Sequence, residues 1–253
     1  MMNKVSQSIA LVTGANDPAG LGFGIAEALL AEGAIVYFGC RLDQQVRALA
    51  EPLKRFESRA RAVQLDVSDP VSIARAFALV ESESSRLDIL VNNAGDGANC
   101  AAIDETAEQW DRIMTANARG SFLCSQAAAR LMIPQRFGRI VNISSQAASV
   151  AIANHVAYSC SKAAINMLTM SMALEWAPFG ITVNAVAPTY LDTPGTRPFL
   201  ENPDFRKSVL SRIPVGRVGT IGEIAHAVQF LVSRNSGLIT GEILMVDGGW
   251  TLS

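Results

Sequence analysis

The stretch IALVTGANDPAGLGFGIAEALL, residues 9–30, decides the fold. Residues 9–13 form a short apolar run typical of a buried strand, and the apolar residues after position 20 recur with a helical period. Four glycines, at positions 14, 20, 22 and 24, stand between the two patterns. A strand that enters a helix through such a turn leaves backbone amides uncovered at the positive end of the helix dipole, which favours a phosphate. The stretch predicts a dinucleotide-binding unit; a purely structural turn is the alternative.

The same alternation of short apolar runs with longer helical segments continues along the chain. Six further runs read as strands, at residues 34–39, 60–66, 88–94, 139–144, 182–188 and 242–249. These runs are apolar almost without interruption, as burial on both faces requires. We therefore predict an α/β fold: a Rossmann-like, doubly wound sheet of seven parallel strands with helices on both faces. A single domain over residues 1–253 is expected at this length.

Local signals support this assignment of elements. Asp69 before Pro70 is typical of a helix start, and Thr220 with Glu223 has the spacing of a capping box. Residues 190–219 show no strong pattern and contain four prolines. Long irregular segments inside compact domains are usually functional, so we expect a substrate lid at about residues 190–215.

Composition excludes several classes of partner. The net charge is -2 and Lys and Arg are scattered, so no nucleic acid is expected. No apolar run approaches the roughly 18 residues that a membrane span needs, and MMNKVSQSIALVTG, residues 1–14, passes from polar residues into a strand pattern. We expect a soluble cytoplasmic protein that needs no membrane.

No metal site is expected. His155 and His226 are too few and too far apart for zinc, and the cysteines lack metal-type spacing. We expect the four cysteines to be reduced and to pack as small core residues: Cys40, Cys100, Cys124 and Cys160.

A tyrosine and a lysine stand four positions apart in AYSCSKAAINMLTM, residues 157–170. On a helix, Tyr158 and Lys162 therefore share one face. A tyrosine that moves protons near neutral pH needs its pKa lowered by about 3 units, or about 4 kcal/mol. A cation at about 4 Å supplies about that much, so we expect Lys162 to lower the pKa of the phenol. The pair alone is weak evidence, because this spacing also occurs by chance on surface helices.

The end of the second strand indicates which dinucleotide is bound. A carboxylate there would bind the ribose hydroxyls of NAD, but YFGCRLD, residues 37–43, offers Arg41. Arginine pairs with a 2′-phosphate, so NADP(H) is favoured. Asp17 in the glycine turn adds a negative charge nearby, which keeps NAD(H) possible, and a solvated surface role for Arg41 is the alternative.

The glycine motif, NNAG at 92–95, NISS at 142–145 and the YxxxK pair follow one another in a fixed order. In this order they closely resemble the short-chain dehydrogenase/reductase family, over essentially the whole chain. The resemblance implies an NAD(P)-dependent oxidoreductase that acts on a ketone or secondary alcohol. It also implies a catalytic set of Asn117, Ser145, Tyr158 and Lys162. Ser145 would bind the substrate oxygen, and Lys162 would bind the nicotinamide ribose. Ser144, the neighbour of Ser145, would pack at the end of the strand. For Asn117, a hydrogen bond between helices is the alternative role.

The resemblance also implies a set of cofactor contacts. These are Gly14, Asn16, Gly20, Leu21, Gly22, Arg41, Asp66, Val67, Asn93, Ala94, Gly95, Tyr158, Lys162, Pro188, Leu191 and Thr193. Two departures from the family pattern stand out. Thr189 replaces a usual glycine, and the glycine turn is two residues longer than the common form, near the spacing of bacterial enoyl reductases. Those enzymes carry tyrosine seven positions before the lysine, where this chain has His155, so the carbonyl-reductase branch is favoured.

The substrate pocket is expected to form from residues 96–103, residues 146–156 and the lid. The candidate substrate contacts are Ser145, Ala147, Asn154, His155 and Tyr158. The small and apolar surroundings suit a mainly uncharged ketone or alcohol; a sugar or polyol, a 3-oxoacyl thioester and a cyclic ketone stay open. A catalytically idle NADP-binding sensor or scaffold is the alternative from another class. The resemblance further implies a homodimer or homotetramer.

Overall fold

The computed structural model describes residue 5 and residues 7–252. Residues 1–4 and 6, part of the stretch 1–14 used for the expectation of a cytoplasmic protein, lie outside the described residues. Seven parallel strands form one sheet in the order β3-β2-β1-β4-β5-β6-β7, which confirms the predicted fold class. The strands are β1 (Ile9–Val12), β2 (Ile35–Cys40), β3 (Ala60–Gln64), β4 (Ile89–Asn92), β5 (Gly138–Ile143), β6 (Ile181–Pro188) and β7 (Ile243–Val246).

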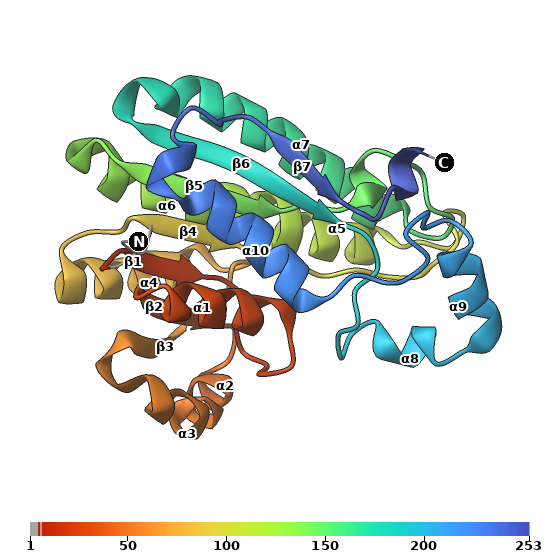
Figure 1. Cartoon of the computed structure of the whole chain (residues 1–253), viewed down its shortest axis with the longest axis horizontal. Coiled ribbons are helices and arrows are strands. Elements are labelled where there is room, and N and C mark those ends of the chain that lie inside the picture. The colour runs from red at the N-terminus through yellow and green to blue at the C-terminus, as the bar shows by residue number, and fades with distance from the viewer. Residues whose placement is uncertain (1–4, 6, 253) are drawn as a thin grey trace.

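Ten α-helices connect or flank the strands in the described chain. They are α1 (Leu21–Ala31), α2 (Asp43–Ala48), α3 (Ala50–Leu53), α4 (Pro70–Ser84), α5 (Ala107–Met114), α6 (Gly120–Gln135), α7 (Val156–Trp176), α8 (Arg197–Leu200), α9 (Pro203–Leu210) and α10 (Ile221–Val232). Helices α1 and α10 pack on one face of the sheet, and α4, α6 and α7 on the other (Figure 1). Both faces of the sheet are therefore covered, as the continuous apolar strands require.

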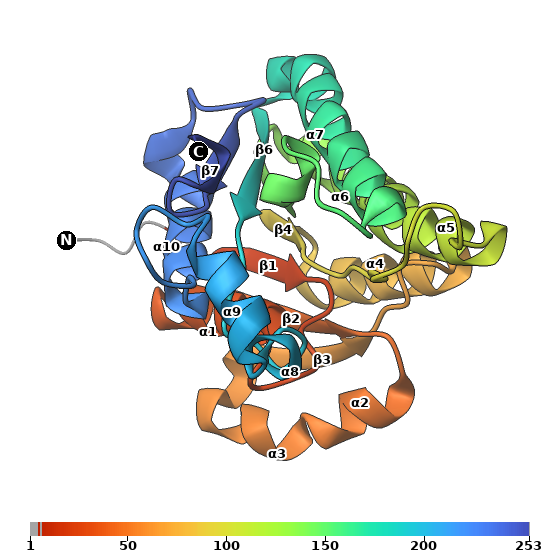
Figure 2. The same cartoon turned by 90° about the vertical axis from the view of Figure 1, so that its right-hand side faces the viewer.

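The predicted helix starts are confirmed. The Asp69 carboxylate accepts a hydrogen bond from the Val71 amide at 2.9 Å, and Thr220 and Glu223 form a reciprocal capping box. The segment after β6 is more ordered than its sequence suggests. It contains α8 and α9, which lie beyond the carboxyl ends of the strands (Figures 1 and 2).

The cysteines are free, as expected, but not all of them are core residues. Cys40 and Cys124 are buried, whereas Cys160 is exposed on α7 and Cys100 is half-buried. The expectation of four core cysteines is thus wrong, because position 160 lies on the outer face of α7. Among the described residues, no helix is both long and apolar enough to span a bilayer, and no cluster of three or more His, Cys, Asp and Glu side chains could bind a metal.

Strand order places the functional residues. The chain runs from β1 outward to β3 and then crosses back to pair β4 with the other side of β1. The loops after β1 and β4 therefore separate above the sheet and open a crevice at its carboxyl edge.

Candidate active site

The glycine turn after β1 is built for close approach. Gly14 has a φ of +65°, and a Cβ there would lie 2.8 Å from the Ala94 Cα; a Cβ on Gly22 would lie 2.4 Å from the Asn93 Nδ2. Asn93 Nδ2 donates to the carbonyl oxygens of Thr13 and Gly14 at 3.0 and 3.1 Å. Gly20 begins α1 without a side-chain cap, so the first amides of α1 keep their hydrogen-bonding capacity. This cradle fits a phosphate of a dinucleotide.

Two adjoining hollows of about 500 and 800 Å³ continue from this turn along the carboxyl edge of the sheet. They share Asn93, Gly95 and Asp96. The first, called here the β6-side hollow, includes Gly20, Leu21, Tyr158, Lys162, Pro188, Leu191 and Thr193. The second, the β2-side hollow, includes Gly14, Asn16, Arg41, Asp66, Val67 and Ala94. Of the predicted cofactor residues, only Gly22 lines neither hollow; it packs against Asn93 beneath the turn.

Arg41 and Asp17 lie in different places. Arg41 is exposed, lines the β2-side hollow and makes no hydrogen bond or ion pair with the described residues. Asp17 lines the β6-side hollow, and its carboxylate accepts a hydrogen bond from the Ala19 amide at 2.9 Å. The negative charge expected near Arg41 therefore lines a different hollow.

Tyr158 and Lys162 share a face of α7, as their spacing predicts. Lys162 is only 4% exposed; its Nζ donates to the Ile143 carbonyl oxygen at 2.7 Å and lies 5.7 Å from the centroid of the Tyr158 ring. Burial lowers the pKa of Lys162 to about 8. Burial also raises the pKa of the Tyr158 phenol, against a hydrogen bond with Ser145 that lowers it. The expected lowering of the phenol pKa by Lys162 is therefore wrong for this structure, because loss of water outweighs the other effects.

Ser145 follows β5 and begins a short 3₁₀ turn. Its Oγ donates to Gln146 Oε1 at 3.0 Å and accepts from the Ala147 amide at 3.1 Å. Ser144 points elsewhere: its Oγ donates to Asn166 Oδ1 on α7 at 2.6 Å. The packing role expected for Ser144 is confirmed, and Ser145 is the serine that faces the tyrosine.

Asn117 is fully buried in a π-helical turn, Thr115–Arg119, between α5 and α6. Its Nδ2 donates to the Asp96 carbonyl oxygen and to Ser161 Oγ, each at 2.8 Å, and its Oδ1 accepts from the Asp96 amide at 2.7 Å. Asn117 thus ties the loop after β4 to α7. It lines none of the hollows described here, so its membership of the catalytic set stays a prediction.

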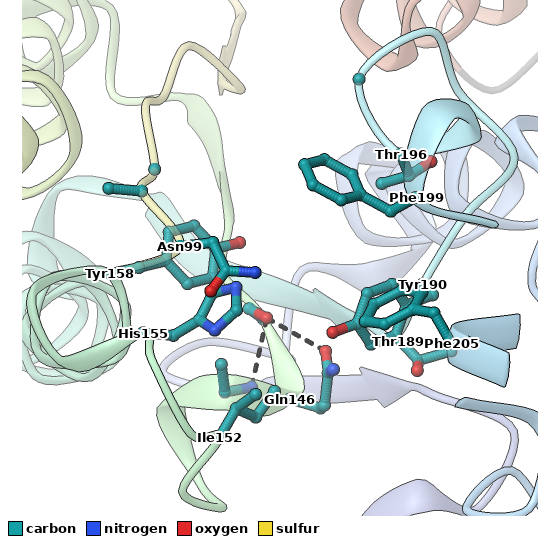
Figure 3. Close-up of a pocket in the computed structure, with 15 residues that line it drawn as sticks. Asn99, Gln146, Ile152, His155, Tyr158, Thr189, Tyr190, Thr196, Phe199 and Phe205 are labelled. Atoms are coloured by element: carbon teal, nitrogen blue, oxygen red, sulfur yellow. Dashed lines mark hydrogen bonds between the residues drawn. The ribbon is translucent and has the colours of Figure 1, made fainter. Parts of the chain in front are cut away.

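A third cavity, of about 360 Å³, adjoins the β6-side hollow at Ser145, Tyr158 and Thr189. We call it the substrate cavity; all three expected segments contribute to its lining, together with Ser145, Tyr158 and Thr189 (Figure 3). Ala147 and His155 line it as predicted, but Asn154 does not. Asn154 instead has a φ of +63°, and its carbonyl oxygen accepts from the Cys100 amide.

Residues 190–205, in the segment expected to form a lid, supply an aromatic wall that sequence reasoning missed. Tyr190, Phe199 and Phe205 line the substrate cavity and stand opposite Tyr158 and His155 (Figure 3). Helices α8 and α9 pack on a small core that includes Trp250, whose ring lies 5.6 Å from that of Tyr190. Helical periodicity in residues 197–210 is the only sequence signal for this wall, and the two helices are too short to make it clear.

Thr189 occupies the position where the family pattern has glycine. Its φ is not positive, so the backbone there needs no glycine. The side chain is buried, lines both the β6-side hollow and the substrate cavity, and its Oγ1 has no hydrogen-bond partner among the described residues. A buried hydroxyl without a partner at this junction fits a polar ligand group.

Comparison with known proteins agrees with this geometry. The family model described as enoyl-(acyl carrier protein) reductase matches residues 14–251. The chain is 38% identical to an NAD-dependent glycerol dehydrogenase of Listeria innocua over 98% of this chain and 95% of the relative. It is 37% identical to a 3-oxoacyl-[acyl-carrier-protein] reductase of Escherichia coli over 95% and 96%. A solved gluconate 5-dehydrogenase from Burkholderia cenocepacia, in complex with NADP and tartrate, superposes with a TM-score of 0.94 at 31% identity, covering 100% of this chain and 98% of the other.

Proposed function

Because the chain belongs to the short-chain dehydrogenase/reductase family, we propose that it transfers hydride between NADP(H) and a ketone or secondary alcohol, with Tyr158 carrying the proton. One observation carries this proposal: Tyr158 and Ser145 line both the β6-side hollow and the substrate cavity. A substrate oxygen at that junction meets a proton carrier and a hydrogen-bond donor while its carbon faces the cofactor side.

The two hollows have the residues to hold the cofactor. The glycine turn would bind the pyrophosphate, Asp66 and Val67 the adenine side, and Lys162 and Thr193 the nicotinamide side. When bound, NADP(H) supplies or accepts the hydride. Ser145 would hold the substrate oxygen, and Asn117 would position the loop that walls the site.

Burial raises the pKa of Tyr158, so the phenol is protonated at neutral pH in the chain without cofactor. The protonated phenol is the form that donates to the oxygen of a ketone, but the raised pKa makes it a weaker acid, so a bound cofactor would have to lower this pKa for efficient proton transfer. Alcohol oxidation needs the phenolate and should become faster as the pH rises. Lys162, charged below a pKa of about 8, would then hold a nearby anion in place.

Preference for NADP over NAD rests on Arg41. Its guanidinium stands exposed and without a partner among the described residues at the β2-side hollow, where a 2′-phosphate could pair with it. The related gluconate 5-dehydrogenase structure contains NADP, whereas the glycerol dehydrogenase is described as NAD-dependent.

The lid and the assembly are part of the proposal. Helices α8 and α9 would close over bound substrate through Phe199 and Phe205. Met167, Met170 and Leu174 expose an apolar stripe along α7 that would pack against a second copy, giving a homodimer or homotetramer. We place the enzyme in the cytoplasm.

The test is turnover. A panel of ketones and alcohols is followed by nicotinamide absorbance with NADP(H) and NAD(H), for the wild type and for Tyr158→Phe. The wild type should turn over at least one carbonyl compound, and Tyr158→Phe should lose this activity while NADP still raises its melting temperature. NADP binding without any turnover would instead support the idle sensor or scaffold. Near-normal turnover by Tyr158→Phe would refute the assignment of the proton carrier.

A further inference from the structure

We propose that the substrate cavity selects a neutral substrate with additional hydroxyl groups and rejects the corresponding sugar acid. This inference rests on the proposed function and concerns the same site. It separates this chain from relatives that act on gluconate, although their overall structure is nearly the same.

The described lining carries no permanently charged side chain that would neutralise a carboxylate. Among the described residues that line the cavity there is no Lys, Arg, Asp or Glu. Three cations near the cavity do not line it and are engaged elsewhere. Lys162 lines the adjoining hollow and donates to Ile143, and Arg197 of the lid pairs with Asp192 at 2.9 Å. Arg212 lies over the ring of Trp250, behind the Tyr190 wall. A carboxylate enclosed without a counter-charge loses its hydration with little in return.

His155 is set up as a hydrogen-bond acceptor. Its Nδ1 lies 2.8 Å from the Ala153 carbonyl oxygen, which can only accept, so the hydrogen is assigned to Nδ1. In the neutral tautomer with this hydrogen, Nε2 is an acceptor. A hydroxyl group can donate to that nitrogen, whereas a carboxylate has no hydrogen to give.

Gln146 complements His155 as a donor. Its Oε1 already accepts from Ser145, and its Nε2 has no partner among the described residues. The serine hydroxyl therefore orients the side-chain amide until that hydroxyl donates to a substrate oxygen, and the two N–H groups of Gln146 are available to a ligand. An acceptor on His155 and N–H donors on Gln146 within the same cavity match the dual character of hydroxyl groups (Figure 3).

A matched pair of substrates tests this selection. D-Glucitol and D-gluconate share a six-carbon polyol skeleton and differ in one terminal group, CH₂OH against carboxylate. Cyclohexanol serves as a neutral alcohol without further hydroxyls. Oxidation of each is followed by nicotinamide absorbance at the pH where the wild type is most active. We expect kcat/KM for glucitol to exceed that for gluconate by about tenfold or more, and to exceed that for cyclohexanol.

The possible failures are distinguishable. A preference for gluconate overturns the selection against charge, and a preference for cyclohexanol overturns the requirement for hydroxyls; in both cases the proposed function stands. If all three are inert, the inference fails, and turnover of any ketone by the wild type but not by Tyr158→Phe decides whether the proposed function survives.

A charge-gain variant tests the cause. Asn99 lines the cavity, is exposed and makes no hydrogen bond with the described residues, so its replacement should leave the fold intact. Asn99→Arg should raise kcat/KM for gluconate relative to glucitol by about tenfold. Asn99→Gln, which adds length without charge, should leave that ratio unchanged. An unchanged ratio in Asn99→Arg, with an unfolding midpoint like that of the wild type, overturns the electrostatic argument.

Discussion

Replacing Lys162 by methionine should make the protein more stable at neutral pH while removing its activity. The ammonium group is almost completely buried and donates one hydrogen bond, to Ile143. No carboxylate forms an ion pair with it among the described residues. Burial lowers its pKa from 10.5 to about 8. The charge is therefore held against an unfavourable environment, as expected for a functional group.

The size of the effect follows from this pKa. The difference between 10.5 and about 8 is about 2.5 units, which corresponds to about 3 kcal/mol of destabilisation when the lysine is charged. Loss of the hydrogen bond to Ile143 offsets about 1 kcal/mol. Methionine fills a similar volume without charge, so we expect Lys162→Met to raise the free energy of unfolding by about 2 kcal/mol.

The pH dependence provides the sharper check. Below pH 8 the lysine is charged in both the folded and the unfolded protein, so the full penalty applies to the wild type. Between pH 8 and 10.5 this lysine is more protonated in the unfolded state than in the folded state. The free energy of unfolding of the wild type therefore rises with pH, because the penalty from the buried charge is lost. The advantage of Lys162→Met should therefore shrink across this window.

Urea unfolding of the ligand-free proteins at pH 7 and pH 10 measures both effects. Lys207→Met, at an exposed position on α9, is the matched control and should change stability little at either pH. The reasoning is refuted if Lys162→Met is less stable than the wild type at pH 7, or if its advantage is the same at both values.

Three further substitutions test the cofactor side. Arg41→Asp should reverse the preference from NADP toward NAD, measured as the ratio of kcat/KM values; an unchanged ratio would exclude Arg41 as the phosphate contact. Thr189→Val removes a buried hydroxyl without a partner among the described residues, so the free energy of unfolding should rise by about 1 kcal/mol. The same change should weaken NADP binding, measured by titration calorimetry. A loss of stability would mean that the hydroxyl has a partner in the protein. Gly22→Ala places a methyl group 2.4 Å from Asn93 Nδ2, so it should lower the free energy of unfolding by about 2 kcal/mol and weaken NADP binding. Gly222→Ala is the control, because its methyl group would have no neighbour closer than 3.9 Å, and it should lower neither. Equal effects of the two changes would argue against the close packing of the turn.

The sequence predicted the sheet and brought most of the expected cofactor residues to the two hollows at its carboxyl edge, for a physical reason. Strands buried on both faces must be continuously apolar, and the motifs that follow β1, β4 and β5 come together because the carboxyl ends of parallel strands share one edge. Helices α8 and α9 were not predicted, because their prolines resemble loop residues. Pro198 and Pro203 in fact stand in the first turns of α8 and α9, where the missing N–H of proline leaves no hydrogen bond unmade.

The electrostatics of the site could not be predicted from spacing. The four-residue interval correctly places Lys162 on the face of Tyr158, but it does not give the exposure of either side chain. Exposure depends on β5, β6 and the lid, and it reverses the expected direction of the phenol pKa shift. Asn154 illustrates the same limit. It precedes His155 in sequence, but its backbone is left-handed and its side chain does not line the cavity.

The order of strands in the sheet has a consequence for synthesis on the ribosome. After β3, each strand from β4 to β7 pairs with the free edge of a strand that has already been synthesised: β4 pairs with β1, and every later strand pairs with the strand before it in sequence. Growth of the sheet can therefore keep pace with translation, and no strand has to be inserted between two that have already paired. The glycine turn and the loop after β4 are synthesised long before Trp250, which packs against the aromatic wall at Tyr190. A cofactor bound to this early part of the sheet would stabilise it while the rest of the chain folds.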